Sequence, residues 1–483
     1  MHPVAAAVPR LAALAERPAL SRLAAAFERA GHELALVGGP VRDALLDREV
    51  KDLDLTTDAR PDTIAEIVRP FAAAQWDTGR AFGTVAARVA GETVEITTYR
   101  RDTYVPSSRK PTVEFGDTLD GDLRRRDFTV NAVAVRLPSL AIVDPTNGIE
   151  AALAKRLTTP SPAVESFDED PLRMLRAARF TAQLGFTLDE EGVAAMRALA
   201  QRIEVVSQER IRDELAKLLA VDRARPGLEL LVGTGLADRV LPELPALRLE
   251  VDAQHRHKDV YEHSLTVLEQ AVELEHLRFP GSSPDLVLRL AALLHDIGKP
   301  ATRRFEPGGQ VSFHHHDVVG AKLARKRLKA LRFPNDQVEQ VAMLIELHQR
   351  FFGYGDAAWT DSAVRRYVRD AGELLPRLHI LVRADVTTRN ARKVRRLAQS
   401  YDDLERRIGE LEAQERLDAI RPDIDGEAIM RELGLRPGPD VGRAYRFLLE
   451  LRLDEGPLGE EEAVRRLHAW WRGGEEDAPP AVP

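Results

Sequence analysis

The chain has 483 residues, of which 44% are hydrophobic and 30% charged, with a formal net charge of −8 and no cysteine. This length exceeds one hydrophobic core and predicts roughly three or four domains, while the lack of cysteine excludes disulfides, zinc–thiolate sites and cysteine nucleophiles. No apolar run reaches the ~18 residues of a membrane span, and the acidic balance argues against nucleic-acid binding unless the basic residues are clustered.

The first 160 residues alternate short β-rich runs with helical ones. Strands are predicted at 34–38, 51–57, 84–90 and 93–100, and helices at 41–46 and 61–74. This alternation predicts a small mixed sheet with helices, an α+β arrangement. From residue 163 to about 400 helical periodicity runs almost throughout. The last 80 or so residues are helical and charged, up to a polar C-terminus that is predicted to be disordered.

The stretch GGPVRDALL places two glycines, Gly38 and Gly39, between a predicted strand and a predicted helix. Glycines at such a turn let the backbone approach a phosphate closely, and the helix N-terminus that follows favours an anion. Arg42 adds a fixed positive fork. Taken alone, a pair of glycines is more often an ordinary tight turn.

Two aspartates, Asp52 and Asp54, flank one leucine in the predicted strand at 51–57. Alternate residues of a strand point to the same face, so the two carboxylates project together and repel unless a cation lies between them. Mg²⁺ is bound by one or two carboxylates plus substrate phosphates, as nucleotidyl transfer requires. Glu95, on a later predicted strand, could supply a third carboxylate. A lone pair of this kind is often a solvated strand edge, but the preceding glycine turn weakens that interpretation.

Four segments, GGPVRDALL, KDLDLTT, VEITTYR and GDLRRRDFTVNAVA, together resemble the polymerase-β-like head domain of class II tRNA nucleotidyltransferases, the CCA-adding enzymes, and of the related bacterial poly(A) polymerases. The resemblance implies that Asp52 and Asp54 hold catalytic Mg²⁺ and that the glycines with Arg42 bind the triphosphate. Pro40 departs from the family's small residue, although proline suits a first helical turn. The resemblance also implies a ribose contact through four residues: Arg125, Arg126, Asp127 and Asn131.

A further motif, ESFDEDPLRMLRAARF, contains Glu169, Asp170 and Arg173. If the motif is helical, Asp170 and Arg173 share a face, and the ordinary interpretation is an intrahelical salt bridge. The resemblance implies instead that the motif hydrogen-bonds the Watson–Crick edge of the incoming base, and Arg176 joins the same nucleotide-binding set. The segment SQERIRDELAKLL resembles the family's next motif, in which Glu209 and Arg212 would brace this helix.

Basic residues are locally clustered despite the overall charge. Arg173, Arg176 and Arg179 recur every three residues, and denser runs follow at 322–332 and 389–396. A helical basic stripe of this kind could track a tRNA backbone, although it is equally typical of a solvated amphipathic face.

Ten of the thirteen histidines lie between His255 and His379, which marks a second chemical centre. The segments YEHSL, LLHDIGKP, FHHHDVVGA, LIELHQR and VRADVTTRN resemble an HD-superfamily metal phosphohydrolase. The resemblance assigns its core ligands to His263, His295, Asp296 and Asp385. His316 and His348 are further candidates, which would allow two metals. Imidazole and carboxylate ligands suit Mg²⁺, Mn²⁺, Ni²⁺ or Fe.

These motifs predict a nucleotidyltransferase head at 1–160, a helical neck and body at 161–250, an HD domain at 251–400 and a helical tail at 401–483. The predicted function is CCA addition to the tRNA 3′ end from CTP and ATP, with an HD phosphodiesterase or phosphatase activity. A poly(A) polymerase, an HD phosphohydrolase whose head only binds nucleotides, and a non-enzymatic RNA-binding protein remain alternatives. The N-terminus lacks the apolar segment of a signal peptide, so a cytoplasmic protein with no membrane partner and no obligate protein partner is expected.

Overall fold

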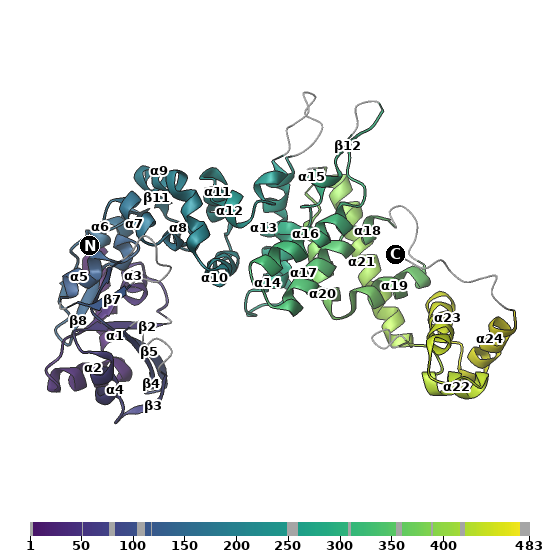
Figure 1. The fold of residues 1–483 in the computed structure, drawn as a ribbon, viewed down its shortest axis with the longest axis horizontal. Helices are drawn as coiled ribbons and strands as arrows, with labels where there is room; N and C mark the ends of the chain where they lie inside the picture. Colours follow the sequence, from purple (N-terminus) through teal and green to yellow (C-terminus); the bar gives the residue numbers. More distant parts are fainter. Residues whose placement is uncertain are drawn as a thin grey trace. The chain divides into compact units, whose positions relative to one another are not determined.

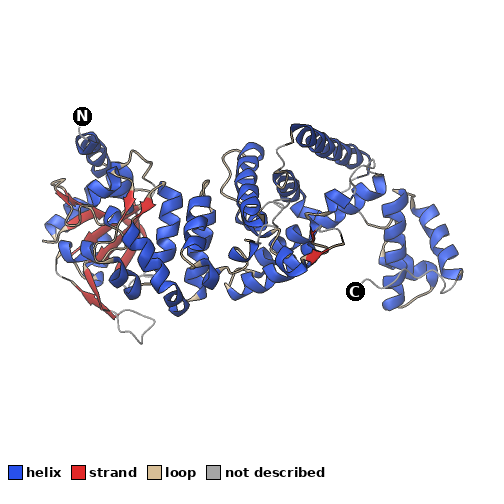
Figure 2. Cartoon of the chain, turned by 90° about the horizontal axis from the view of Figure 1, so that it is seen from above, coloured by secondary structure: helices blue, strands red, loops and turns tan. Residues whose placement is uncertain are grey.

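A computed structural model describes residues 3–50, 52–76, 83–103, 112–116, 118–248, 259–307, 311–353, 360–387, 390–415 and 421–473. The chain forms two compact units, one of residues 1–245 with 330–333 and one of residues 246–329 with 334–483 (Figure 1). Most strands belong to the N-terminal unit, and the C-terminal unit is largely helical (Figure 2). In the part of the chain so described, no helix has the length and apolarity that a membrane crossing needs.

A seven-stranded mixed sheet forms the base of the N-terminal unit, with strand order β3-β4-β5-β2-β1-β8-β9. β2 and β5 are parallel, and the other neighbours are antiparallel. The predicted mixed sheet is therefore confirmed. Its strands are β1 (Leu34–Val37), β2 (Leu53–Thr57), β3 (Ala72–Trp76), β4 (Thr84–Val89), β5 (Glu92–Thr98), β8 (Ala134–Leu137) and β9 (Ile142–Val143).

The helix predicted at 61–74 is wrong in its second half. The helix α4 runs only from Pro61 to Val68, and the chain then enters β3 at the edge of the sheet. Arg69 still has helical dihedral angles, but Pro70 has no N–H to donate to the next helical hydrogen bond, which explains the break. Two short ladders lie outside the main sheet, one of β6 (Arg100–Thr103) with β7 (Thr112–Phe115) and one of β10 (Arg156–Leu157) with β11 (Thr187–Leu188).

Helices cover both faces of the sheet. α1 (Pro3–Ala15) contributes Leu11 and Leu14 to the larger core, and α2 (Pro18–Arg29) contributes Leu20, Leu23 and Phe27. This core also contains the inward side chains of β2, β4 and β5. β1 is buried along its whole length, because its alternate side chains enter a second cluster with α5 (Leu119–Arg124).

A helical region follows the sheet and packs around one central helix, α8 (Leu172–Leu184). A Cβ added to Gly227 of α11 would meet the carbonyl oxygen of Ala178 at 2.4 Å, so the two helices approach closely only with glycine there. The remaining helices are α3 (Gly39–Leu45), α6 (Gly148–Leu153), α7 (Ala163–Glu169), α9 (Glu190–Leu199), α10 (Gln208–Leu219), α11 (Arg225–Gly233) and α12 (Ala237–Val240), with short 3₁₀ turns η2 (Thr129–Asn131), η3 (Ala200–Val205) and η4 (Pro245–Leu247).

The C-terminal unit consists of helices and one short hairpin of β12 (Arg304–Phe305) and β13 (Val311–Ser312). Its last three helices have a core of their own, built around Ile429, Leu448 and Leu467. The helices are α13 (Val260–Arg278), α14 (Leu286–Leu294), α15 (Lys299–Thr302), α16 (His316–Ala330), α17 (Asn335–Leu347), α18 (Arg350–Gly353), α19 (Asp361–Ala371), α20 (Leu375–Ala384), α21 (Ala391–Glu415), α22 (Gly426–Leu433), α23 (Pro439–Glu455) and α24 (Glu460–Arg472), with a 3₁₀ turn η5 (Gly372–Leu374). The polar end predicted to be disordered, residues 474–483, lies outside the described residues.

Candidate active sites

The glycine turn joins β1 to α3 in the N-terminal unit. Gly38 has a φ of +75°, in the left-handed region that favours glycine, and a Cβ added there would meet Nη1 of Arg126 at 3.2 Å. Pro40 lies in the first turn of α3, where a missing N–H leaves no intrahelical bond unmade. Arg42 is buried, and its Nη1 donates to Oδ1 of Asn131 at 2.7 Å. The turn thus gathers the backbone of Gly38 and Gly39 with two guanidinium groups.

The paired aspartates lie beside a third carboxylate. Asp54 of β2 stands opposite Glu95 on the parallel strand β5, while Leu53 is buried in the core. Asp52 precedes the strand and is exposed. Burial and the negative charges of Glu95 and Asp52 raise the pKa of Asp54 to about 6, against the opposing effect of Arg126. This crowding of carboxylates is relieved by a bound cation, so Asp52 and Asp54, with Glu95 beside them, fit a divalent metal with oxygen ligands.

A buried aspartate that the sequence did not single out organises the arginine-rich segment. Asp122 of α5 accepts hydrogen bonds from Nη2 of Arg125 at 2.7 Å and from Nη2 of Arg126 at 3.1 Å. Burial alone would raise the pKa of Asp122, but Arg126 and Arg125 hold it below its usual range. Asp122 therefore orients Arg126 beside Gly38. The spacing of three and four residues within GDLRRRD was the signal for this contact.

Two of the residues expected to contact the ribose, Asp127 and Asn131, connect α3 to α8 through hydrogen bonds. Nδ2 of Asn131 donates to Oδ1 of Asp127 at 3.0 Å, and Nε of Arg176 donates to Oδ2 of Asp127 at 2.7 Å. Burial opposes ionisation of Asp127, but Arg176 and the Asn131 hydrogen bond hold its pKa well below the usual range. Arg42, Asn131, Asp127 and Arg176 are thus linked in that order.

The same contacts continue to α10 through Glu214. Glu214 is 4% exposed and accepts from Nε of Arg179 at 2.7 Å, with Arg176 Nη1 at 3.8 Å. The ring of Phe180 lies 4.1 Å from the Arg179 guanidinium, 5.5 Å from that of Arg176 and 5.4 Å from that of Arg42. The ring therefore fixes three cations that would otherwise repel one another. Sequence reasoning missed both Glu214 and Phe180.

Asp170 and Arg173 do not share a helical face, contrary to expectation. Asp170 lies between α7 and α8, and its Oδ1 accepts from the backbone N of Leu172 at 3.2 Å. Arg173 is buried and donates from Nη2 to the carbonyl oxygen of Arg125 at 2.6 Å. Glu169 ends α7, with Oε2 3.8 Å from Arg173 Nη1. Pro171 breaks the helix that the sequence pattern suggested.

Glu209 and Arg212 were expected to hold α8 in place. The ion pairs from α10 to α8 are made by Glu214 instead. Glu209 is exposed in the first turn of α10, and Arg212 pairs with its neighbour Asp213 at 2.7 Å. At 3.6 residues per turn, Glu214 lies roughly 140° around the helix from Glu209, on the side that meets α8. The proposed basic stripe of α8 is also wrong, because Arg173 and Arg179 are buried and face other side chains.

Six predicted metal ligands converge in the C-terminal unit. His263, His295 and Asp385 offer ligand atoms within 4.8 Å of one another, and Asp296, His316 and His348 form a second such group. Asp296 connects the groups, since its Oδ2 lies 3.2 Å from Nε2 of His295 and its Oδ1 lies 3.3 Å from Nε2 of His316. These two buried atoms, Asp296 Oδ1 and His316 Nε2, face each other and make no other polar contact with the described residues. The six ligands come from five separate helices or their ends.

The far nitrogen of each imidazole is held by a hydrogen bond. Nδ1 of three rings meets the backbone carbonyl three residues earlier: His295 meets Ala292 at 2.9 Å, His316 meets Phe313 at 2.8 Å and His348 meets Ile345 at 2.5 Å. Nδ1 of His263 lies 2.9 Å from Oγ1 of Thr387. These contacts direct all four Nε2 atoms inward, as the supporting contacts of metal-binding histidines do. The centre therefore fits one or two divalent cations.

The two denser basic runs differ in their surroundings. In α16, Nε of Arg325 lies 2.7 Å and Nζ of Lys329 3.5 Å from Glu339 carboxylate oxygens. In α21, Arg392, Lys393 and Arg395 are exposed and form no ion pair with the described residues. Exposed basic residues without an ion pair among the described residues therefore occur in both runs, because Lys322 and Lys326 of α16 are exposed and unpaired in this sense as well.

Comparisons with known proteins agree with both centres. Family models match at residues 34–158 (poly A polymerase head domain), 185–247 (probable RNA and SrmB-binding site of polymerase A) and 260–390 (HD domain). The A-adding tRNA nucleotidyltransferase of Deinococcus radiodurans is 36% identical over 448 residues, 90% of this chain and 95% of that protein. The chain belongs to the tRNA nucleotidyltransferase family. The CC-adding tRNA nucleotidyltransferase of Thermus thermophilus is 34% identical over 452 residues, 91% of this chain and 94% of that protein.

Solved structures of tRNA nucleotidyltransferases share the fold. A Bacillus stearothermophilus CCA-adding enzyme in complex with CTP superposes with a TM-score of 0.64 at 24% identity, covering 98% of both chains. A Thermotoga maritima CCA-adding enzyme complexed with tRNA gives a TM-score of 0.60 at 17% identity, covering 96% of this chain and 98% of that one. The family resemblance is therefore confirmed, and the chain is a nucleotide-transferring enzyme with an HD domain. A poly(A) polymerase is not favoured.

Proposed function

We propose that the N-terminal unit adds the CCA sequence to the 3′ end of tRNA from CTP and ATP, one nucleotide at a time. The observation that carries this proposal is the unbroken series of hydrogen bonds from Arg42 through Asn131 and Asp127 to the partly buried Arg176. It links the residues suited to phosphate with the helix suited to reading the base. One nucleotide site of this kind serves both CTP and ATP in turn.

In this proposal the 3′ oxygen of tRNA attacks the α-phosphorus of the nucleotide. The bond from that phosphorus to the bridging oxygen of the β-phosphate breaks, pyrophosphate leaves, and the proton of the 3′ hydroxyl passes to water. Asp52 and Asp54 would hold Mg²⁺, which lowers the pKa of the 3′ hydroxyl and neutralises the developing charge. Gly38, Gly39 and Arg42 receive the triphosphate.

Base selection is the proposed task of the residues around α8. Arg125, Arg126, Asp127 and Asn131 would face the ribose and the adjoining phosphates. Glu169, Asp170, Arg173 and Arg176 would present donors and acceptors to the base. An arginine fork beside a carboxylate gives directed hydrogen bonds, which a lysine would not.

A second candidate is addition of the terminal A alone, favoured by the name of the Deinococcus radiodurans relative. The Thermus thermophilus relative is CC-adding, so proteins similar to this chain along most of their length divide the task. Partial addition therefore needs a direct test.

In the C-terminal unit we propose a metal-dependent phosphohydrolase acting on 2′,3′-cyclic phosphates and 2′-phosphates of RNA ends. The two ligand groups would hold divalent ions such as Mg²⁺, Mn²⁺, Ni²⁺ or Fe, which would activate water and stabilise charge on the phosphate, and Asp296 lies close to ligands of both groups. For a cyclic phosphate, a water oxygen attacks phosphorus, one phosphorus–ribose oxygen bond breaks, and the proton of water passes to the released ribose oxygen. We place both activities in the cytoplasm, where tRNA would be the partner.

Paired variants test the two activities. Asp54→Asn is expected to lower nucleotide addition by more than about 100-fold, because a metal ligand loses its charge, while hydrolysis of 2′,3′-cyclic AMP is unchanged. His295→Ala is expected to do the reverse. Loss of both activities in either well-folded variant would contradict separate centres, and a metal-loaded wild type that leaves cyclic phosphates intact would contradict the hydrolase.

A further inference from the structure

The β12–β13 hairpin lies between α15 and α16 along the chain (Figure 1), and a residue on either side of it contacts a ligand of the HD centre. On one side, Nζ of Lys299 donates to Oδ2 of Asp296 at 2.6 Å, five residues before β12 begins. On the other, Phe313 directly follows β13, and its carbonyl oxygen meets Nδ1 of His316 at 2.8 Å. The ammonium of Lys299 also lies 5.7 Å from the ring of Phe313. The hairpin is therefore part of the rim of the metal centre.

The hairpin presents an aromatic ring to solvent. Phe305 is 73% exposed, and the guanidinium of Arg303 lies 4.8 Å from the centre of its ring. Phe305 pairs with Val311, two residues before Phe313. With about 3.4 Å per residue along a strand and about 4.8 Å between strands, the Cα atoms of Phe305 and Phe313 lie within about 12 Å. The exposed ring is thus carried on the strand that pairs with β13, and β13 leads directly to Phe313, whose carbonyl oxygen contacts His316.

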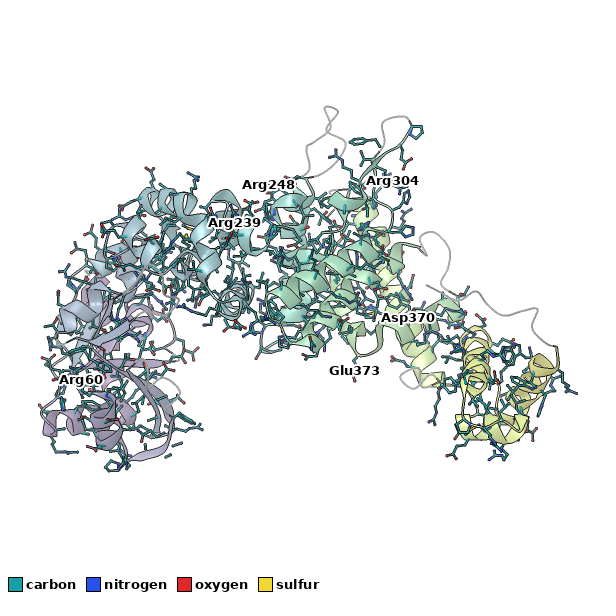
Figure 3. All side chains as sticks on the ribbon, viewed as in Figure 1. Arg60, Arg239, Arg248, Arg304, Asp370 and Glu373 are labelled. Carbon is teal, nitrogen blue, oxygen red and sulfur yellow. The ribbon has the colours of Figure 1, made fainter. Side chains whose placement is uncertain are left out.

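Positive charge accompanies the ring. Arg304 is exposed on the hairpin and forms no ion pair with the described residues, and Figure 3 labels it there. Glu306, the acid in the described part of the hairpin, accepts a hydrogen bond from Oγ of Ser312 at 2.5 Å, and its charge offsets one of the two neighbouring arginines. His314 and His315, which follow the hairpin, are exposed as well. An aromatic face with an arginine against it and a further arginine beside it is how proteins bind single-stranded nucleotides without base pairing.

We propose that this hairpin is the base-binding arm of the HD centre. The free face of Phe305 stacks on the base of a nucleotide whose phosphoester lies on the six ligands, and Arg304 binds the next phosphate when the nucleotide ends an RNA strand. The substrate class is therefore a nucleotide, with its base recognised as a flat ring and not by sequence. This inference rests on the hydrolase proposed above.

The test compares substrates with and without a base. Phe305→Ala is expected to raise KM for 2′,3′-cyclic AMP about tenfold, within the range of base–aromatic stacking, and to leave kcat unchanged. The 2′,3′-cyclic phosphate of 1-O-methylribose, which has no base, should be hydrolysed equally by the variant and the wild type. Phe279→Ala is the matched control, because Phe279 is also an exposed aromatic of this unit but lies about 24 Å along α13 from His263.

Binding separates this inference from the hydrolase itself. Calorimetric titration of 2′,3′-cyclic AMP into the Mn²⁺-loaded full chain, with a non-reactive CTP analogue filling the head, needs no turnover. If 2′,3′-cyclic AMP binds more weakly to Phe305→Ala than to wild type, and wild type does not hydrolyse it, the base-binding arm is supported and the hydrolase is rejected. Hydrolysis unaffected by Phe305→Ala, or reduced equally for the base-free compound, would overturn the arm. Arg304→Ala should weaken binding of a trinucleotide ending in the cyclic phosphate more than that of the mononucleotide; equal effects would restrict the ligand to free nucleotides.

Discussion

Replacement of Glu214 by glutamine tests most sharply how α8, the helix proposed to read the base, is held in place. The substitution keeps the side-chain volume but removes the charge that faces Arg179 at 2.7 Å and Arg176 at 3.8 Å. A hydrogen bond to a charged group contributes about 1.5–3 kcal/mol. Since glutamine can still accept one hydrogen bond, we expect about 2 kcal/mol of interaction energy to be lost. This is less than the roughly 3–5 kcal/mol lost when one partner of a buried ion pair is removed.

If the lost energy is the energy that positions Arg176 and Arg179, kcat/KM for nucleotide addition drops about 30-fold, since 1.4 kcal/mol corresponds to a tenfold change. Discrimination of CTP and ATP against UTP and GTP should weaken as well, because the forks of Arg176 and Arg179 are no longer held. The assay is single-nucleotide addition to tRNA with each nucleotide separately, alongside thermal unfolding. Glu209→Gln, on the exposed side of the same helix, is the matched control. Equal behaviour of the two variants would refute the reasoning.

Two further predictions concern the C-terminal unit. Chelation of divalent ions should lower the melting temperature of this unit by about 5–10 °C, because a ligand at 100 times its Kd contributes about 2.7 kcal/mol of stability. Addition of Mn²⁺ should restore the melting temperature. A His295→Ala variant that responds to the chelator as strongly as wild type would contradict the assignment of the metal ligands. Burial lowers the pKa of His379 to about 4, against Glu405 and with help from Arg278 and Arg383. The pKa of His379 is lower in the folded protein than its unfolded value of about 6.5. The contribution of the neutral imidazole to stability is therefore complete above about pH 6.5 and is lost as the pH falls toward 4. The melting temperature of wild type should therefore fall more between pH 7.5 and 5 than that of His379→Gln, and parallel curves would contradict the buried neutral imidazole.

The gathering of six candidate metal ligands in the C-terminal unit could be predicted residue by residue. All six ligands occur in short motifs with distinctive neighbours, such as HD followed by GK, and the fold brings them together as expected. Histidines gathered in one region of a cysteine-free chain already pointed to metal chemistry. The hairpin between Lys299 and His316 carried no such pattern, because its meaning depends on which residues anchor it.

The helical region of the N-terminal unit was less predictable. A motif fixes residue types but not the rotation of a helix about its axis, and long-range packing decided that Glu214, not Glu209, meets α8. Pro171 likewise separated Asp170 from Arg173, although the spacing suited one helix. Asp122 was overlooked because an acid just before a run of arginines looks like part of a solvated charged segment until its burial is known.

The central claim is that one nucleotide site completes the CCA end, and sequencing of product ends tests it most directly. Three tRNA substrates, ending before the first C, after the first C and after the second C, are incubated with CTP, ATP, UTP and GTP together. The account predicts that all three finish in CCA and stop. Products that gain only A from the third substrate, only CC from the first, or a run of A residues would contradict it.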